Sequence, residues 1–343
     1  MKLMWLYFIR AYVGAGLFFY FKSIKVYDIE NVVKNKPVLL LSNHQNALLD
    51  ALIIAVKSGR FSYFLTRAGV FNKPFVAKLL KSFQMLPVYR VRDGWGKLSN
   101  NEAIFEACSK LLNNGASVVI FPEGNHSLKR MVRPLSKGFT RIVFETLETY
   151  PTTNLQLVPV GLNYAEATSF PDSASIYFGK PIAAKPYYLD DRNAAIVKLK
   201  AKIQAEIGQL TTDIPKANYE VTIEVLKRLE VDFLNPKAVN TCVASNLQNC
   251  VARKVVSSSV LKPLFLVLLK CAYVLPFLIW RYMVKPKIKD IEFIATFRFA
   301  MVIILAPLWL ISLFVILLLT LGWHVAVAYV LISLCIALLA VKL

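Results

Sequence analysis

The sequence predicts an α/β domain with a largely parallel sheet flanked by helices, plus an N-terminal interfacial helix and a C-terminal helical membrane hairpin. Between residues 35 and 233, apolar segments of strand length alternate with helical patterns, which favours parallel βαβ units. Near the C-terminus, two long uncharged runs follow one another. The chain is 56% hydrophobic and 18% charged, a composition that excludes disorder and disfavours a purely soluble globule.

The first 24 residues are apolar and aromatic, but Arg10 interrupts them. Trp5, Tyr7 and Phe8 are residues that favour the membrane–water boundary, so we expect an interfacial anchor helix over residues 1–24. A shallow span is the alternative. No small-residue cleavage site of the secretory type follows this segment.

Residues 25–240 form the expected α/β domain. Strands are predicted at 37–42, 61–65, 117–121, 155–160 and 174–178, and helices at 47–56 and 102–112. An amphipathic stripe at helical spacing, which is typical of core packing, follows at Ile196, Leu199, Ile203, Ile207 and Leu210.

Residues 241–298 are predicted to be a basic connector, and residues 299–343 a transmembrane hairpin. Residues 299–321 are 23 positions without a charge, which exceeds the length needed to cross a hydrocarbon core of about 30 Å. Residues 325–341 form the second run. Residues 264–280 contain Lys270 and Pro276, and a full span there would move the basic stretch 281–298 across the membrane. We therefore expect a re-entrant or interfacial helix.

The charge balance predicts an anionic partner. Lys and Arg number 41 against 21 Asp and Glu, a net charge of +20, which suits nucleic acid, a phosphorylated substrate or an acidic bilayer. No base-reading module accompanies the basic residues, so we expect no nucleic acid. The five cysteines show no C-x-x-C pair, which disfavours a zinc site or a disulfide framework and favours a reducing compartment.

One candidate catalytic pair is His44 and Asp50. His44 directly follows the predicted strand 37–42, and polar residues at the carboxyl end of a buried strand lie where open α/β sheets place their sites. Histidine removes a proton from a hydroxyl when a carboxylate orients it. Six residues on one helix do not share a face, so His44 should lie in the loop before the helix and Asp50 in its first turns. A capping role with a satisfied histidine is the alternative.

A second polar cluster, FPEGNHS at residues 121–127, also follows an apolar strand. Its Pro and Gly predict a tight turn that presents Glu123, and Lys129, Arg130 and Arg133 follow at once. Elsewhere, Arg90 and Arg92 adjoin a short predicted strand, and guanidinium groups suit a phosphate. Most other basic residues suit a solvated or lipid-facing surface.

Four ordered blocks, from residues 37 to 181, resemble the glycerol-3-phosphate and 1-acylglycerol-3-phosphate acyltransferases. These are the strand with NH-x₅-D, then PVYRVRD, FPEGNHS and VPVGLNY. The resemblance implies that His44 is the general base, oriented by Asp50. It implies glycerol phosphate binding by the arginine block (Arg90, Arg92) and by Glu123, Gly124 and Ser127. For the transfer step itself, we expect a backbone N–H or Asn43 to stabilise the oxyanion.

Two departures from the family pattern bear on these roles. Five residues rather than the more usual four separate His44 from Asp50, a spacing more similar to fungal-type glycerol-3-phosphate acyltransferases. The third block usually continues Gly-Thr-Arg-Ser, whereas Asn125 and His126 stand here. The missing arginine leaves Arg90, Arg130 or Arg133 as the phosphate contact, and Arg90 is the first choice.

The implied activity is acyl transfer from acyl-CoA or acyl-carrier protein to a hydroxyl of 1-acyl-sn-glycerol 3-phosphate, with glycerol 3-phosphate as the alternative acceptor. No metal or other cofactor is expected. The partner surface is an anionic membrane, with the catalytic domain on its cytoplasmic face. A lipid hydrolase is disfavoured because no G-x-S-x-G elbow is present. A nonenzymatic membrane-docking protein is the remaining rival.

Overall fold

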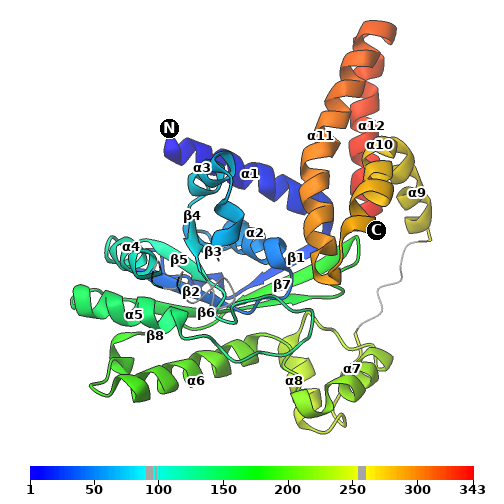
Figure 1. Ribbon diagram of the computed structural model, residues 1–343. Coiled ribbons are helices and arrows are strands. Elements are labelled where there is room, and N and C mark those ends of the chain that lie inside the picture. The colour runs from blue at the N-terminus through cyan, green and yellow to red at the C-terminus, as the bar shows by residue number, and fades with distance from the viewer. Residues whose placement is uncertain (90–95, 97–98, 100, 254–259) are drawn as a thin grey trace.

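A computed structural model describes residues 1–89, 96, 99, 101–253 and 260–343. Its centre is a mixed, mostly parallel sheet in the order β1-β7-β6-β2-β5-β3-β4, with the short β8 beside β6. Helices cover both faces of the sheet, and two long helices rise from one end of it (Figure 1). The predicted α/β class with a largely parallel sheet is confirmed.

Strand β2 (Val38–Ser42) lies at the centre, parallel to β5 (Ser117–Ile120) on one side and to β6 (Gln156–Tyr164) on the other. Its side chains alternate between two cores, as the period of two along a strand requires. Leu39 and Leu41 pack with helices α4, α5 and α6, whereas Val38 and Leu40 pack with α1, α2 and α11. Both faces are apolar because helices cover both.

The other elements have the following bounds. The strands are β1 (Phe21–Tyr27), β3 (Ser62–Arg67), β4 (Met85–Val88), β7 (Asp172–Phe178) and β8 (Ile182–Ala183). The helices of the domain are α2 (Ala47–Lys57), α3 (Pro74–Ser82), α4 (Asn101–Asn113), α5 (Gly138–Thr149), α6 (Arg192–Leu210), α7 (Tyr219–Arg228) and α8 (Pro236–Ala244). The first and last stretches contain α1 (Lys2–Tyr20), α9 (Lys262–Ala272), α10 (Val274–Leu278), α11 (Ile294–Leu321) and α12 (Trp323–Lys342).

Helices α7 and α8 form a small cluster below the sheet (Figure 1). Its core includes Ile223, Leu226 and Val239, and Cys242 is bonded to Cys250 in a disulfide. The sequence analysis disfavours a disulfide framework, and this one disulfide was not predicted. The two cysteines are eight residues apart, a spacing that matches no metal or redox motif and so gave no signal.

Three helices within the described residues are long and apolar enough to cross a membrane. They cover Leu3–Tyr20, Ile291–Leu321 and Trp323–Lys342, and the last two form the predicted hairpin. Many of its side chains are exposed, among them Ile304, Leu308, Ile311 and Leu319. Because Lys342 Nζ donates to the Phe21 carbonyl at 2.8 Å, the returning helix ends at the sheet.

Helix α1 contacts the α/β domain along its length. Trp5 stacks on Phe83, Tyr7 packs edge-on against Phe61, and Gly16 lies against Ile303 of α11. Figure 1 shows α1 running across the base of the hairpin. The interfacial position of this helix stays a prediction, and these contacts favour it.

The segment predicted to be re-entrant is bent. The helices Lys262–Ala272 and Val274–Lys287 meet at 97°, which suits either a broken span or a re-entrant loop. Pro276 interrupts the helical hydrogen bonding near this bend. The division of the chain at residues 24, 240 and 298 stays a prediction.

Candidate active site

The candidate site begins where β2 ends. His44 lies in the three-residue loop between Ser42 and the helix cap Asn46, and Asp50 lies in the first turn of α2. Ala47, the first residue of that helix, has a φ of +34°, a backbone angle that is strained for alanine. This tight entry folds the loop back over the helix and brings His44 to Asp50, as the spacing argument predicts.

Asp50 is fully buried and accepts four hydrogen bonds. Its Oδ2 accepts from His44 Nδ1 at 2.8 Å and from the backbone N–H groups of Gln45 and Asn46, each at 2.7 Å. Its Oδ1 accepts from the Tyr164 hydroxyl at 2.5 Å. Since an ionised carboxylate only accepts, the proton of neutral His44 lies on Nδ1 and the lone pair on Nε2.

Two aromatic rings hold the His44 imidazole in place. Phe121 stacks on its face with ring centroids 4.0 Å apart, and His126 meets it edge-on with centroids 5.7 Å apart. The His44 side chain is 12% exposed, so its ring is confined but reachable. An imidazole with this surrounding presents Nε2 as a base in a fixed direction.

Asn43 is buried and committed to the fold. Its Nδ2 donates to the Leu162 carbonyl at 2.9 Å and to Thr211 Oγ1 at 3.2 Å, and its Oδ1 accepts from Leu162 N–H at 2.8 Å. These bonds tie the end of β2 to β6. The geometry therefore suits a positioning role for Asn43 rather than an oxyanion contact.

The loop at residues 121–127 lies beside His44. Gly124 has a φ of +78°, which favours glycine, and Ser127 N–H donates to the His44 carbonyl at 3.0 Å. The side chain of Glu123 is only 3% exposed; its Oε2 accepts from Arg133, whereas its Oε1 has no hydrogen-bond partner among the described residues. Burial raises the pKa of Glu123, and the Arg133 guanidinium opposes that rise.

Two of the predicted phosphate-binding arginines, Arg130 and Arg133, lie within the described residues, and both are engaged by protein acceptors. Arg130 is buried and donates to the carbonyls of Tyr164 and Ala165, at 2.8 and 2.9 Å. Arg133 is paired with Glu123 and Asn125. Both guanidinium groups thus already serve protein acceptors. Arg90, our first choice, and Arg92 lie outside the described residues.

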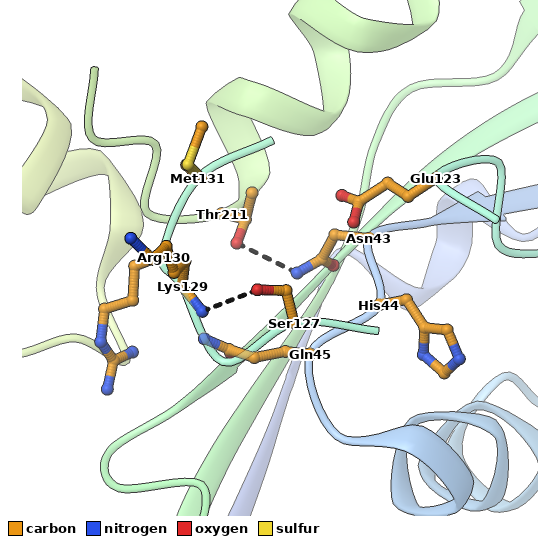
Figure 2. A pocket seen from close by; sticks show the side chains of 9 residues that line it. All are labelled: Asn43, His44, Gln45, Glu123, Ser127, Lys129, Arg130, Met131 and Thr211. Atoms are coloured by element: carbon orange, nitrogen blue, oxygen red, sulfur yellow. Dashed lines mark hydrogen bonds between the residues drawn. The ribbon is translucent and has the colours of Figure 1, made fainter. Parts of the chain in front are cut away.

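A shallow hollow opens beside His44 (Figure 2). Its lining is almost entirely polar and consists of Asn43, His44, Gln45, Glu123, Ser127, Lys129, Arg130, Met131 and Thr211. In Figure 2, the imidazole lies at one edge of this hollow, and the Arg130 guanidinium points away at the opposite edge. The surface next to the His44 imidazole is therefore polar.

Two residues of the site were missed by the sequence analysis. Tyr164 lies in the VPVGLNY block, but nothing in the pattern indicated that its hydroxyl reaches Asp50. Glu292 accepts from His126 Nδ1 at 2.7 Å across 166 residues, and its position in the basic connector gave no signal. Within the described residues, no group of three or more His, Cys, Asp or Glu side chains is arranged to hold a metal ion.

The fold and this site define a class of protein: an α/β protein with apolar helices long enough to cross a membrane and a carboxylate-oriented histidine at the carboxyl end of a central strand. The comparisons with known proteins make the class specific. Residues 23–163 match the acyltransferase family model, so this segment is similar to acyltransferase domains.

Curated relatives carry the same assignment. An uncharacterised acyltransferase of Schizosaccharomyces pombe is 27% identical over 40% of this chain and 22% of its own length. Glycerol-3-phosphate O-acyltransferase 2 of Saccharomyces cerevisiae is 26% identical over 39% and 18%. The chloroplastic 1-acyl-sn-glycerol-3-phosphate acyltransferase LPAT1 of Arabidopsis thaliana is 25% identical over 37% and 34%. The match thus spans about a third or less of these relatives.

The crystal structure of the 1-acyl-sn-glycerophosphate acyltransferase PlsC from Thermotoga maritima superposes with a TM-score of 0.45. Its sequence is 17% identical, and the match covers 61% of this chain and 80% of that one. The similarity to acyltransferases therefore rests on the sequence matches.

Proposed function

We propose that the protein transfers a fatty acyl group from acyl-CoA or acyl-carrier protein to the free hydroxyl of 1-acyl-sn-glycerol 3-phosphate, which makes phosphatidic acid. The observation that carries the proposal is the His44–Asp50 pair beside a polar hollow, within an acyltransferase-family domain. The names of several relatives state this acceptor.

In the proposed reaction, Nε2 of His44 removes the proton of the acceptor hydroxyl. The oxygen attacks the thioester carbonyl carbon, and the resulting intermediate collapses as the carbon–sulfur bond breaks. The thiolate then takes the proton from His44, so that atoms and charges balance and the enzyme is regenerated. Asp50 stabilises the imidazolium that exists between these two proton transfers.

The hollow suits the acceptor's polar head. Glu123 has a buried oxygen without a partner among the described residues, and a buried acceptor of this kind is costly unless a ligand donates to it. A glycerol hydroxyl supplies that donor. Ser127, Gly124 and the predicted Arg90 and Arg92 complete the proposed binding of the phosphate-bearing head.

Glycerol 3-phosphate is the second candidate acceptor. It is favoured by the names of two yeast relatives and by the five residues between His44 and Asp50. The two acceptors differ in one acyl chain, which 1-acyl-sn-glycerol 3-phosphate carries and glycerol 3-phosphate lacks. A hairpin embedded in the bilayer places that acyl chain next to the α/β domain.

We also infer that the α/β domain faces the cytoplasm. The support is the basic stretch 281–298, because positively charged segments next to spans favour that side. The Cys242–Cys250 disulfide argues for the opposite side, since disulfides are rare in reducing compartments.

The test uses the purified full chain in vesicles, with labelled acyl-CoA or acyl-carrier protein and one acceptor at a time. We expect incorporation into 1-acylglycerol 3-phosphate, and a His44→Ala loss of about 10²–10⁴-fold, the usual contribution of a general base. A matched His324→Ala variant, altered in the hairpin turn, should retain the wild-type rate. A wild-type protein inactive with both acceptors and both donors, or a His44→Ala variant near the wild-type rate, would sink the proposal.

A further inference from the structure

The start of the membrane hairpin, residues 291–299, is built into the α/β domain; we call it the hairpin foot. Ala295 and Phe299 are buried in the same core as the central strand β2. Thr296 Oγ1 accepts from the N–H of Leu48, near the start of α2, at 3.2 Å. The hairpin therefore contacts the site's supporting structure as well as anchoring the chain, because its first turn packs against the helix that carries Asp50.

The hairpin foot also reaches the catalytic histidine through His126. Glu292 accepts a hydrogen bond from His126 Nδ1 at 2.7 Å, and the Phe293 ring meets the His126 ring edge-on with centroids 4.6 Å apart. His126 in turn packs edge-on against His44. A continuous row of contacts thus joins the membrane hairpin to the proposed base.

We propose that Glu292 is a positioning residue of the acyl-transfer site, acting through His126 on His44. The inference rests on the function proposed above and deepens it, because residues 291–299 lie beyond the segment matched by the family model. Glu292 fixes the ring and the Nδ1–H tautomer of His126. His126 then confines the His44 imidazole against Phe121.

The charges around the two rings give this arrangement a second effect. Asp50, Glu123 and Glu292 face the pair from α2, from the loop after β5 and from the hairpin foot. Burial and the nearby His44 lower the pKa of His126, whereas Glu292 raises it. When His44 takes the substrate's proton and becomes positively charged, a neutral His126 adds no repulsive charge beside it. The half-buried position of His126 between His44 and Phe293 thus favours the action of His44 as a base.

Kinetics of acyl transfer in vesicles test the positioning role. We expect Glu292→Ala to lower kcat by about tenfold, the usual cost of losing an outer partner of a site residue, with the acceptor KM little changed. Glu292→Gln retains an oxygen that accepts from Nδ1–H and should recover most of kcat. In a His126→Ala background, Glu292→Ala should have no further effect. Glu148→Gln, which breaks an ion pair of equal length with Arg192, is the control.

A spectroscopic readout separates positioning from general destabilisation. The chain has three histidines, so ¹³Cε1-histidine labelling gives three signals that substitutions assign. We expect Glu292→Gln to lower the pKa of His126, because the charge that raises it is gone. Glu292→Ala should shift the His44 signal and leave that of His324 unchanged.

Three results would overturn the inference in an active protein. These are a wild-type kcat in Glu292→Ala, a full additional loss from Glu292→Ala in the His126→Ala background, and an unmoved His44 signal. If Glu292→Ala does not fold, the His126 titration in Glu292→Gln and the kcat of His126→Ala decide instead. If the wild-type protein shows no acyl transfer, the proposed function itself is wrong. That outcome is distinct from the three above, which compare variants with an active wild-type protein.

Discussion

The two histidine–carboxylate pairs of the site are held in different ways. Asp50 lies six residues from His44, is fully buried and accepts four hydrogen bonds, two of them from the backbone. Glu292 lies 166 residues from His126, is 30% exposed and has one such partner within the described residues. The first pair is built by a local turn of the chain. The second depends on the seating of the hairpin foot.

The comparison predicts that the buried pair matters more. We expect Asp50→Asn to lower kcat by about 10²–10³-fold, because the imidazolium of His44 loses its counter-charge. The asparagine oxygen can still accept from the backbone N–H groups, so the fold should persist. Acyl transfer and thermal unfolding of the same preparation measure both effects.

Glu292→Gln is the matched change in the second pair and should cost far less. Equal losses in the two variants would break the comparison. A large fall in Tm of the Asp50→Asn variant would mean that its lower kcat results from a less stable fold.

Tyr164 extends the comparison of the two pairs, because its hydroxyl donates to Asp50 and the Glu292 pair has no such additional donor among the described residues. In Tyr164→Phe, Oδ1 of Asp50 is left buried without its partner, at a cost of about 1–3 kcal/mol in the free energy of unfolding. We expect kcat to fall by about tenfold, since Asp50 then holds His44 less firmly.

The control is Tyr177→Phe, which removes a hydroxyl that donates to the Leu234 carbonyl at 2.9 Å on strand β7, away from the site. It should lower stability without lowering kcat. Similar kcat values for the two variants would show that Tyr164 acts only through the fold.

The same contrast between local and long-range contacts explains which features could be predicted from the sequence. The pairing of His44 with Asp50 was predictable because a buried strand, a polar loop and a helix follow one another directly in the chain. The parallel sheet was predictable from the same alternation. Strand β1 was missed because it directly follows the apolar helix α1.

Long-range partners were not predictable from local patterns. Arg130 was expected at a phosphate, yet burial against Phe233 and two backbone carbonyls engages its guanidinium. Glu292 looked like one acidic residue in a basic connector, and only the packing of Ala295 and Phe299 into the core brings it to His126. Residue composition and motif spacing do not indicate contacts between residues that are far apart in the chain.

The smallest expected effect separates the two routes by which the hairpin foot meets the site. Thr296→Val keeps the shape of the side chain and removes the acceptor of the Leu48 N–H, at a cost of about 1 kcal/mol in unfolding free energy. Because this half-buried hydrogen bond reaches α2 rather than the two rings, kcat should stay within about twofold of wild type. Parallel assays of Thr296→Val and Glu292→Ala make the comparison. A Thr296→Val loss as large as that of Glu292→Ala would mean that the hairpin influences Asp50 through α2, and that the contact between His126 and His44 is not the route.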